Sequence, residues 1–359
     1  MMKQWVLKAL LTTTIIFLFI GAFNYTFDPL QQYRASTFYK PHFTNARYLT
    51  PGLAKNYPYD SVIVGSSMTE NFIISNVKEI IGFTHPIKFT SGGTTAHELK
   101  LILEVAFKHK NIQNVLYGLD FYAFSGDKKR LLHGKGSLPL YLYDDNYLND
   151  YKYIFNIDTT KVSLKTTLIQ SLKSKSIELN YNKMFEWQHR YKPNDFNETK
   201  VLRMWNNPQI RFNKNFNVKN FSLEKLKQSF EYNLLSLIKK HPQTTFYIFY
   251  PPYSILAYID AKSNGSLKNI LMFKKYIFNE LSKYKNVKLY DFQVAKEVTF
   301  NLNNYRDLTH YHQKTNHWIL ECIKNDQYLI TSKTIENCNT TLEQQVAKYS
   351  KQLEKDSHH

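Results

Sequence analysis

The chain has 359 residues, of which 43% are hydrophobic and 16% aromatic. This apolar content is enough for one large or two smaller packed domains, and it excludes a disordered, collagen-like or coiled-coil protein for most of the chain. The net charge of +18 reflects either compositional drift or an anionic neighbour such as phospholipid headgroups or acidic glycan. Cys322 and Cys338 are too few for a disulfide scaffold or a thiolate zinc site, and whether they form a single bridge stays open.

The N-terminal segment predicts a membrane anchor. Lys3 and Lys8 precede an uncharged, apolar run from Ala9 to Phe23. With the residues around Lys8 included, the apolar stretch is just long enough to cross a bilayer. A cleavable signal peptide is the alternative, but the Ile-Gly-Ala-Phe end of the run is a poor cleavage site. We therefore expect residues 1–23 to be a single-pass anchor, with the N-terminus in the cytoplasm and the body outside, because the basic residues precede the run and Asp28 follows it.

The rest of the chain predicts an α/β domain with an insertion. Residues 24–58, rich in Tyr, Phe and Pro, are expected to form an extended connector. Residues 59–330 are expected to form the main domain, interrupted at about 126–240 by a large, mostly helical insertion, and residues 331–359 a polar tail. The predicted strands are Ser61–Val64, Ile87–Phe89, Asn114–Asp120, Thr245–Tyr250 and Val287–Tyr290, and the main predicted helices are Met68–Ile81, Ala96–Phe107, Ser222–Lys239, Leu267–Leu281 and Gln313–Ile323.

Strands that alternate with helices predict a parallel sheet covered on both faces, with functional residues in the loops at the carboxyl ends of the strands. The loops after the first four predicted strands carry Ser66 and Ser67, Gly92 and Gly93, Asp120, and Pro251 and Pro252. These loops are where a candidate site is expected.

Three distant residues suggest nucleophilic catalysis. Ser67 stands where a strand turns into a helix, so its hydroxyl can project from the edge of the sheet. Asp307 and His310 are three residues apart, and within a tight turn the carboxylate can accept from one ring nitrogen and leave the other to receive the serine proton. Gly92 and Gly93 permit close backbone approach, so an N–H from either can contribute to an oxyanion hole.

Other residues near these motifs allow competing interpretations. Ser66 competes with Ser67 as the nucleophile, and Tyr253 is expected to line a substrate cleft. His312 and His317 suggest a metal site together with His310, but no carboxylate or thiolate set with a familiar ligand spacing accompanies them. The sequence predicts no metal, no cofactor and no nucleic-acid partner.

The chain resembles the SGNH (GDSL-type) esterase and acyltransferase superfamily. Gly65–Ser67 matches the first block of that superfamily, Ser91–Thr95 the second, and Asp307 with His310 the last. It is most similar to the membrane-anchored branch that includes D-alanyl-lipoteichoic acid transfer proteins and alginate O-acetylation proteins. The resemblance covers roughly residues 58–125 and 243–320. It implies a flavodoxin-like parallel sheet, with Ser67 as the nucleophile and the backbone of Ser67 and Gly93 in the oxyanion hole.

The third block departs from the superfamily pattern. A Gly-x-Asn is usual there, and its amide donates to the oxyanion; this chain reads Gly118-Leu119-Asp120. An ionised Asp120 would repel the charge that an amide stabilises, and loss of one such donor costs on the order of 10²–10³ in rate in other serine enzymes. Either Asp120 is held protonated, or it orients another donor, or hydrolysis is slow and transfer is the main reaction. A strand-end Asp that caps the next turn is the structural alternative.

These observations predict a serine esterase or O-acyltransferase that acts on cell-envelope glycan or polymer, at the outer face of a bacterial cytoplasmic membrane. The resemblance also implies a multi-spanning membrane O-acyltransferase as partner. Two alternatives stay open, a non-catalytic accessory subunit of an envelope-modification complex and a deacetylase that removes acyl groups.

Overall fold

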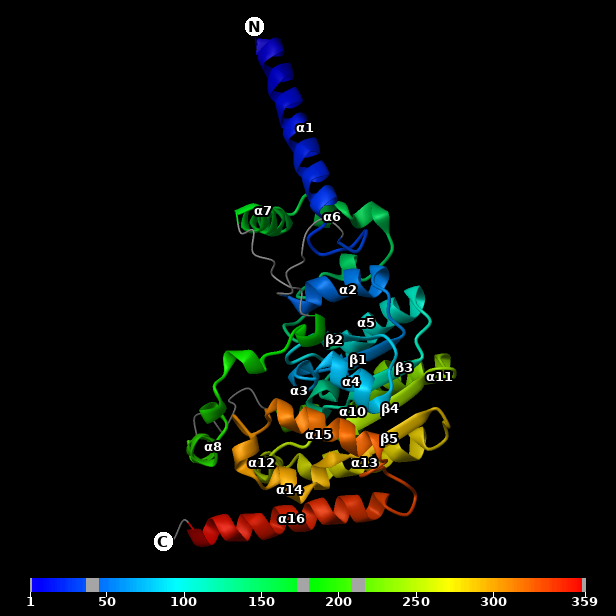
Figure 1. The fold of residues 1–359 in the computed structure, drawn as a ribbon, viewed down its shortest axis with the longest axis vertical. Helices are drawn as coiled ribbons and strands as arrows, with labels where there is room; N and C mark the ends of the chain where they lie inside the picture. The colour runs from blue at the N-terminus through cyan, green and yellow to red at the C-terminus, as the bar shows by residue number, and fades with distance from the viewer. Residues whose placement is uncertain (1, 37–44, 173–180, 208–216, 357–359) are drawn as a thin grey trace. The chain divides into compact units, whose positions relative to one another are not determined.

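The computed structural model describes residues 2–36, 45–172, 181–207 and 217–356, which form two compact units (Figure 1). The first unit contains residues 1–58, 102–110 and 136–181, and the second contains residues 59–101, 111–135 and 182–359. The expected insertion at 126–240 is thus divided between the two units. Its first half clusters with the N-terminal segment, because Tyr153 and Ser163 hydrogen-bond to residues just after the apolar run. The terminal residues 357–359 of the expected tail lie outside the described residues.

In the first unit, helix α1 (Met2–Phe27) is long and apolar enough, from Lys3 onward, to cross a membrane. It is the only such helix in the part of the chain that the structure describes. That length and composition are shared by membrane anchors and signal sequences. Asp28, which directly follows α1, is buried and has a positive φ of 40°. Its carboxylate accepts from the backbone N–H groups of Gln32 and Tyr33, and these bonds turn the chain away from the helix.

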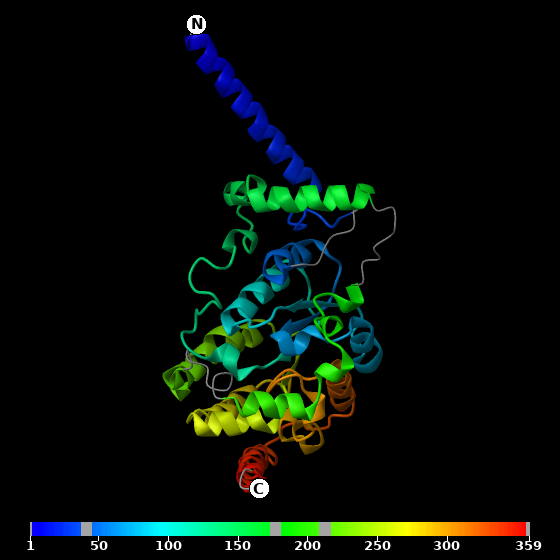
Figure 2. The same cartoon turned by 90° about the vertical axis from the view of Figure 1, so that its left-hand side faces the viewer.

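The expected extended connector contains a helix, α2 (Ala46–Asn56). Pro51 inside this segment favours a break, because proline removes one helical hydrogen bond. Burial overrides that preference: Leu49 and Leu53 are in the core of the unit. A side chain at Gly52 would collide with the backbone of Leu30, so the helix packs directly on the turn that follows α1. The unit also contains α6 (Tyr151–Ile154) and α7 (Ile157–Leu172), shown with α1 in Figure 2.

The second unit is built on a five-stranded parallel sheet, as the sequence predicted. The strands are β1 (Ser61–Gly65), β2 (Pro86–Thr90), β3 (Asn114–Gly118), β4 (Thr245–Tyr250) and β5 (Val287–Asp291), in the order β2-β1-β3-β4-β5. This is the strand order of flavodoxin-like doubly wound sheets, whose ligands bind where the order reverses, at the carboxyl ends of the two central strands. Here that point lies between β1 and β3, which pair in parallel from Ser61 with Asn114.

Side chains on both faces of the sheet are buried. All five residues of β1 are buried, which requires cover on each side because successive side chains point to opposite faces. Ile63, Leu116 and Phe249 belong to one core with residues of the flanking helices, while Val62 and Val115 are equally inaccessible. The helices of this unit are α3 (Ser67–Glu70), α4 (Ile74–Ile81), α8 (Glu198–Trp205), α10 (Leu223–Phe230), α11 (Ser236–Lys240), α12 (Ile255–Ser263), α13 (Leu267–Leu281), α14 (Lys296–Thr299), α15 (Gln313–Lys324) and α16 (Ile335–Asp356). Helix α5 (Ala96–His109) is divided, since its residues from Ile102 onward belong to the first unit.

The expected polar tail is mostly the helix α16. Leu342 and Val346, one turn apart, are fully buried in the core that also contains α12 and α13. The tail is therefore an integral part of the second unit. Cys322 and Cys338 are free thiols.

Candidate functional site

Two glycines set the turn that presents Ser67. Gly65, the last residue of β1, has a φ of +150°, and a side chain there would lie 2.7 Å from Thr69. A side chain at Gly118, on the neighbouring strand β3, would collide with the same threonine. Ser66 caps α3, and Ser67 is the first residue of that helix. Without Cβ atoms at both strand ends, α3 can sit directly on the edge of the sheet, with Ser67 above the point where the strand order reverses.

Ser67, His310 and Asp307 form one hydrogen-bonded chain. Ser67 Oγ lies 2.9 Å from His310 Nε2. On the other side of the ring, His310 Nδ1 lies 2.8 Å from Asp307 Oδ2. With the Nδ1 hydrogen donated to the carboxylate, Nε2 is left as an acceptor for the serine hydroxyl. The structure thus brings together the three residues that we expected to act together, across 243 positions of sequence.

The surroundings of Asp307 keep this carboxylate ionised. Burial alone raises the pKa of Asp307, but the hydrogen bond and charge of His310 and the backbone N–H groups of His310 and Thr309 together lower that pKa well below its ordinary value. Those two N–H groups donate to Oδ1 at 2.8 and 3.0 Å. Arg306 adds an ion pair of 2.9 Å to Oδ2. The carboxylate is therefore a fixed acceptor that holds the imidazole in one orientation.

Trp187 packs against this hydrogen-bonded chain. Its indole N–H donates to the backbone carbonyl of Ser67 at 2.8 Å, and its ring meets the ring of His310 edge-on, with centroids 5.6 Å apart. The guanidinium of Arg306 lies 4.3 Å from the ring centroid of Tyr191 and 5.4 Å from that of Trp187. Sequence reasoning missed these aromatic residues, because they lie in a stretch without helical or strand periodicity.

Ser66 and Asp120 form a separate pair. Ser66 Oγ donates to Asp120 Oδ2 at 3.0 Å, whereas it is Ser67 Oγ that contacts His310. Asp120 also accepts from the backbone N–H of Tyr122 at 2.9 Å and from the hydroxyl of Tyr253. Burial raises the pKa of Asp120, although these hydrogen bonds oppose the shift. Tyr253, which we expected to line a cleft, is only 1% exposed, and its hydroxyl donates to Asp120.

The glycine loop after β2 faces the candidate nucleophile. A Cβ on Gly92 would lie 3.9 Å from Ser67 Cβ. The N–H of Gly92, however, donates to the carboxylate of Glu70, so this amide is occupied in a way that the sequence did not predict. Burial raises the pKa of Glu70, and the Gly92 N–H and Lys88 oppose that shift. Gly93 has a φ of +65°, a conformation that favours glycine.

A buried lysine forms hydrogen bonds with backbone carbonyls at and just after the end of α3. Lys88, on β2, is fully buried, and its ammonium donates to the backbone carbonyls of Glu70 and Phe72 at 2.8 and 2.9 Å. Burial lowers the pKa of Lys88 to about 7, although Glu70 and Glu186 oppose that shift. Neither Glu70 nor Lys88 was identified from the sequence, where a carboxylate three residues after Ser67 was the only available signal.

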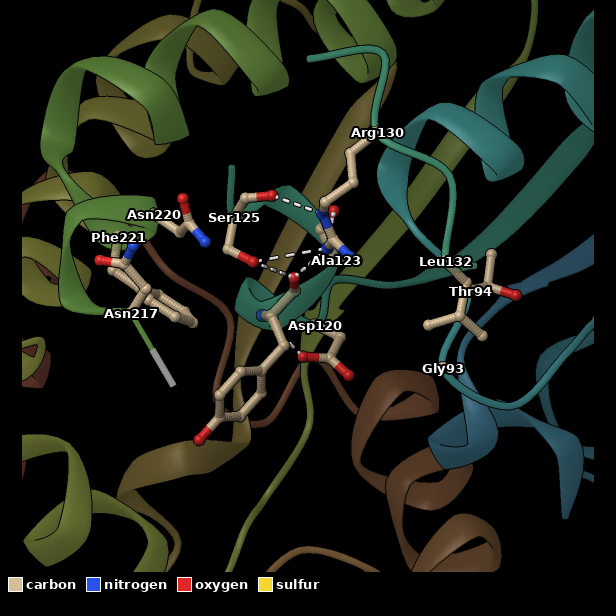
Figure 3. A pocket seen from close by; sticks show the side chains of 11 residues that line it. Gly93, Thr94, Asp120, Ala123, Ser125, Arg130, Leu132, Asn217, Asn220 and Phe221 are labelled. Carbon is tan, nitrogen blue, oxygen red and sulfur yellow. Dashed lines mark hydrogen bonds between the residues drawn. The ribbon is translucent and has the colours of Figure 1, made fainter. Parts of the chain in front are cut away.

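A cavity of about 390 Å³ lies beside Gly93 and Asp120 (Figure 3). It is lined by Gly93, Thr94, Asp120, Tyr122, Ala123, Ser125, Arg130, Leu132, Asn217, Asn220 and Phe221. Arg130 shapes one wall, because its guanidinium donates to the backbone carbonyls of Tyr122 and Ser125, each at 2.8 Å. Asn217 and Asn220 add amides on the opposite wall in Figure 3. The lining combines hydrogen-bonding groups with an aromatic surface, as sites for polar organic ligands do.

The two histidines that suggested a metal site together with His310 have other hydrogen-bond partners. His312 caps α15, where its side chain accepts from the N–H of Lys314 at 3.0 Å. His317 lies 3.2 Å from the amide of Asn76. Within the described ranges, no group of three His, Cys, Asp or Glu residues is placed to hold a metal ion.

No protein-family model, no curated protein and no solved structure matches this chain. The case for a function therefore depends on the geometry of the site.

Proposed function

We propose that this chain is a serine-dependent esterase or O-acyltransferase, with Ser67 as nucleophile, His310 as general base and acid, and Asp307 as the group that orients His310. The single observation that carries this proposal is the position of His310. Its Nε2 lies 2.9 Å from Ser67 Oγ, while its Nδ1 is held 2.8 Å from the partly buried carboxylate of Asp307. This is the arrangement that activates a serine hydroxyl.

In the first half-reaction, Ser67 Oγ attacks the carbonyl carbon of an ester and its proton moves to His310 Nε2. The resulting imidazolium is stabilised by Asp307 and returns the proton to the leaving alkoxide, so that an alcohol departs and an acyl-serine ester remains. In the second half-reaction, His310 accepts the proton of an acceptor hydroxyl, which attacks the acyl carbon. The proton then returns to Ser67 Oγ. A glycan hydroxyl as acceptor gives transfer, and water gives hydrolysis.

The contacts of Asp120 favour a positioning role over a direct one. Ser66, Tyr253 and the Tyr122 N–H all use this side chain as an acceptor. Asp120 therefore supports the Ser66–Ser67 turn and replaces the amide donor that related enzymes would place there. We assign the oxyanion contacts to the backbone of Ser67, whose N–H has no acceptor within α3 by its position, and to the loop at Gly93.

The length and apolar composition of α1 and the resemblance to the SGNH superfamily support a location and a substrate class. We propose that α1 anchors the chain in a bacterial cytoplasmic membrane, with the site on the outer face. Cell-envelope glycan or polymer is then the acceptor, and a multi-spanning O-acyltransferase partner supplies the acyl group. Lys3 and Lys8, on the N-terminal side of the apolar run, support this orientation.

A fluorophosphonate probe tests the nucleophile in the full-length chain. Wild type is expected to be labelled, Ser67→Ala to be unlabelled, and Ser66→Ala to remain labelled, since Ser66 contacts Asp120 instead of His310. Equal labelling of wild type and Ser67→Ala would reject the proposal. A chromogenic ester with and without sugar acceptors separates transfer from hydrolysis, and hence from a deacetylase.

A non-catalytic accessory subunit is the second candidate. The observations that favour it are the carboxylate of Asp120 where an amide donor is usual and the occupation of the Gly92 N–H by Glu70. Under this alternative, His310→Ala leaves envelope modification in cells unchanged. Loss of modification in that variant, with normal protein abundance, would reject the accessory role.

A further inference from the structure

The segment from Tyr147 to Leu164 exposes an unusual number of large hydrophobic side chains. It contains the short helix η3 (Tyr147–Asn149), α6 and the described part of α7. Six large hydrophobic residues in it are between 44% and 88% exposed: Tyr147, Leu148, Tyr151, Phe155, Ile157 and Leu164. Such a concentration marks an interaction surface on a protein, since scattered single residues are the normal pattern.

The exposed side of α7 combines large apolar residues with charged ones, because Asp158, Lys161 and Lys165 are exposed beside Ile157 and Leu164. Its buried side carries Thr159 and Ser163, and Ser163 donates to the side chain of Asn24 at 3.0 Å. Ile157 and Leu164, two turns apart and therefore on one face, are exposed. A helix in water buries its apolar face and exposes its polar one. Buried Thr159 and Ser163, with exposed apolar residues next to exposed lysines, fit a helix that lies at the boundary between lipid and water.

Contacts with α1 show at which position along that helix the segment packs. Phe155 packs against Phe17, with ring centroids 5.8 Å apart, and a side chain at Gly21 would lie 2.9 Å from the Phe155 ring. The buried amide of Asn24 donates to the carbonyl of Ile154 at 2.7 Å and to Thr160 at 2.8 Å. Figures 1 and 2 both show α7 lying across the C-terminal end of α1.

Helix geometry relates that level to a bilayer. The 16 residues that follow Lys8, up to Asn24, rise roughly 24 Å at 1.5 Å per residue, which approaches the hydrocarbon thickness of about 30 Å. Asn24 then stands at the outer boundary of the hydrocarbon, and Phe17, which Phe155 contacts, lies inside it. Aromatic and aliphatic side chains at this level are typical of the membrane interface.

We propose that η3, α6 and α7 form an interfacial element that lies on the outer leaflet of the bilayer crossed by α1, with Tyr147, Leu148, Ile157 and their exposed neighbours in contact with lipid. This inference depends on the proposed membrane insertion of α1. The occupant is lipid because the surface continues directly from the apolar helix. The polar Asn24, Thr160 and Ser163 network fixes the element to that helix.

Site-specific fluorescence in vesicles tests this element in the full-length chain. Cys338→Ser supplies the background, since Cys322 is buried. An environment-sensitive fluorophore is attached at Leu148→Cys or Ile157→Cys. Ile16→Cys, in α1, reports insertion of the anchor, and Met272→Cys, exposed on α13, reports the aqueous control. Each protein is reconstituted into phosphatidylcholine–phosphatidylglycerol vesicles that contain nitroxide-labelled lipid.

Nitroxide lipid is expected to quench the labels at positions 148 and 157 at least threefold more strongly than the label at 272, and iodide is expected to show the reverse order. If the labels at 148 and 157 behave like the control while the label at 16 is quenched, the interfacial element is wrong and the anchor stands. If the label at 16 is also unquenched, both the anchor and the interfacial element are wrong.

Discussion

The indole N–H of Trp187 donates to the backbone carbonyl of Ser67 at 2.8 Å. This bond links a segment of no recognisable pattern to the residue that carries the proposed chemistry. Trp187 is 6% exposed, so the bond is shielded from water. It holds the first residue of α3, while the Lys88 ammonium binds the carbonyl of Glu70, the last residue of that helix, and the carbonyl of Phe72.

Trp187→Phe is therefore expected to reduce kcat/KM for a chromogenic ester. The substitution keeps an aromatic ring beside His310 and removes one hydrogen bond, whose net value of about 0.5–1.5 kcal/mol corresponds to a loss of roughly two- to tenfold. Trp318→Phe is the matched control, because Trp318 packs against Phe292 and Tyr328. Equal effects of the two substitutions would show that the contact with Ser67 has no role.

Gly118→Ala is expected to lower kcat without an equivalent loss of stability. The new methyl group collides with Thr69 Cγ2 and displaces α3, and a displacement of about 1 Å can cost on the order of 10² in rate. The second-site change Thr69→Ser removes that methyl group and keeps the hydroxyl, which donates to the carbonyl of Ser66 at 2.8 Å. The double variant should recover much of the lost kcat. Absence of any recovery would contradict the proposed packing of α3.

The stability of the fold is expected to rise with pH above neutrality because of Lys88. Burial lowers its pKa to about 7, below the value in the unfolded chain, so the unfolded state binds more protons between pH 7 and about 10. Stability therefore increases with pH in this window, by at most about 1.4 kcal/mol per unit. Denaturant titrations at pH 7, 8 and 9 measure the slope.

Lys88→Met should flatten that slope, and Lys78→Met, which removes an exposed lysine from α4, should not change it. Parallel slopes in the wild type and in Lys88→Met would show that Lys88 does not titrate in this range. The comparison of slopes is independent of any loss of absolute stability that Lys88→Met causes.

Filling the cavity beside Gly93 is expected to impair use of a large acceptor more than hydrolysis of a small ester. Asn220 is partly exposed on the cavity wall, so Asn220→Trp can place a ring in the cavity at little cost to folding. The ratio of transfer to hydrolysis, measured with a small chromogenic ester and oligosaccharide acceptors, should fall at least fivefold. The neighbouring Lys219→Trp, outside the cavity lining, should leave the ratio unchanged. An unchanged ratio in both variants would mean that the acceptor binds elsewhere.

Sequence patterns were sufficient for the parts of the fold that depend on local periodicity. The β-branched run at Ser61–Val64 and the aromatic run at Thr245–Tyr250 both form strands of the parallel sheet, close to the predicted limits. The position of Ser67 at the carboxyl edge of the sheet also follows from chain order, because Ser67 comes directly after β1.

The missed features depend on tertiary contacts. Helix α2 forms around Pro51 because Leu49 and Leu53 are buried. Trp187 lies in a stretch without periodicity, and only the folded chain places it over Ser67. The Gly92 amide was expected to be available for an oxyanion, but Glu70 binds it, and nothing in a Gly-Gly pair indicates which carboxylate will approach.

The central claim is that Ser67 Oγ is the nucleophile and that His310 activates it. Full-length protein is treated with an acylating or phosphonylating ester, and tandem mass spectrometry locates the adduct within residues 56–78, which contain both Ser66 and Ser67. The account predicts an adduct on Ser67 in the wild type and a rate of formation lower by a factor on the order of 10⁶ in His310→Ala. An adduct on Ser66, or one that forms at the wild-type rate in His310→Ala, would contradict it.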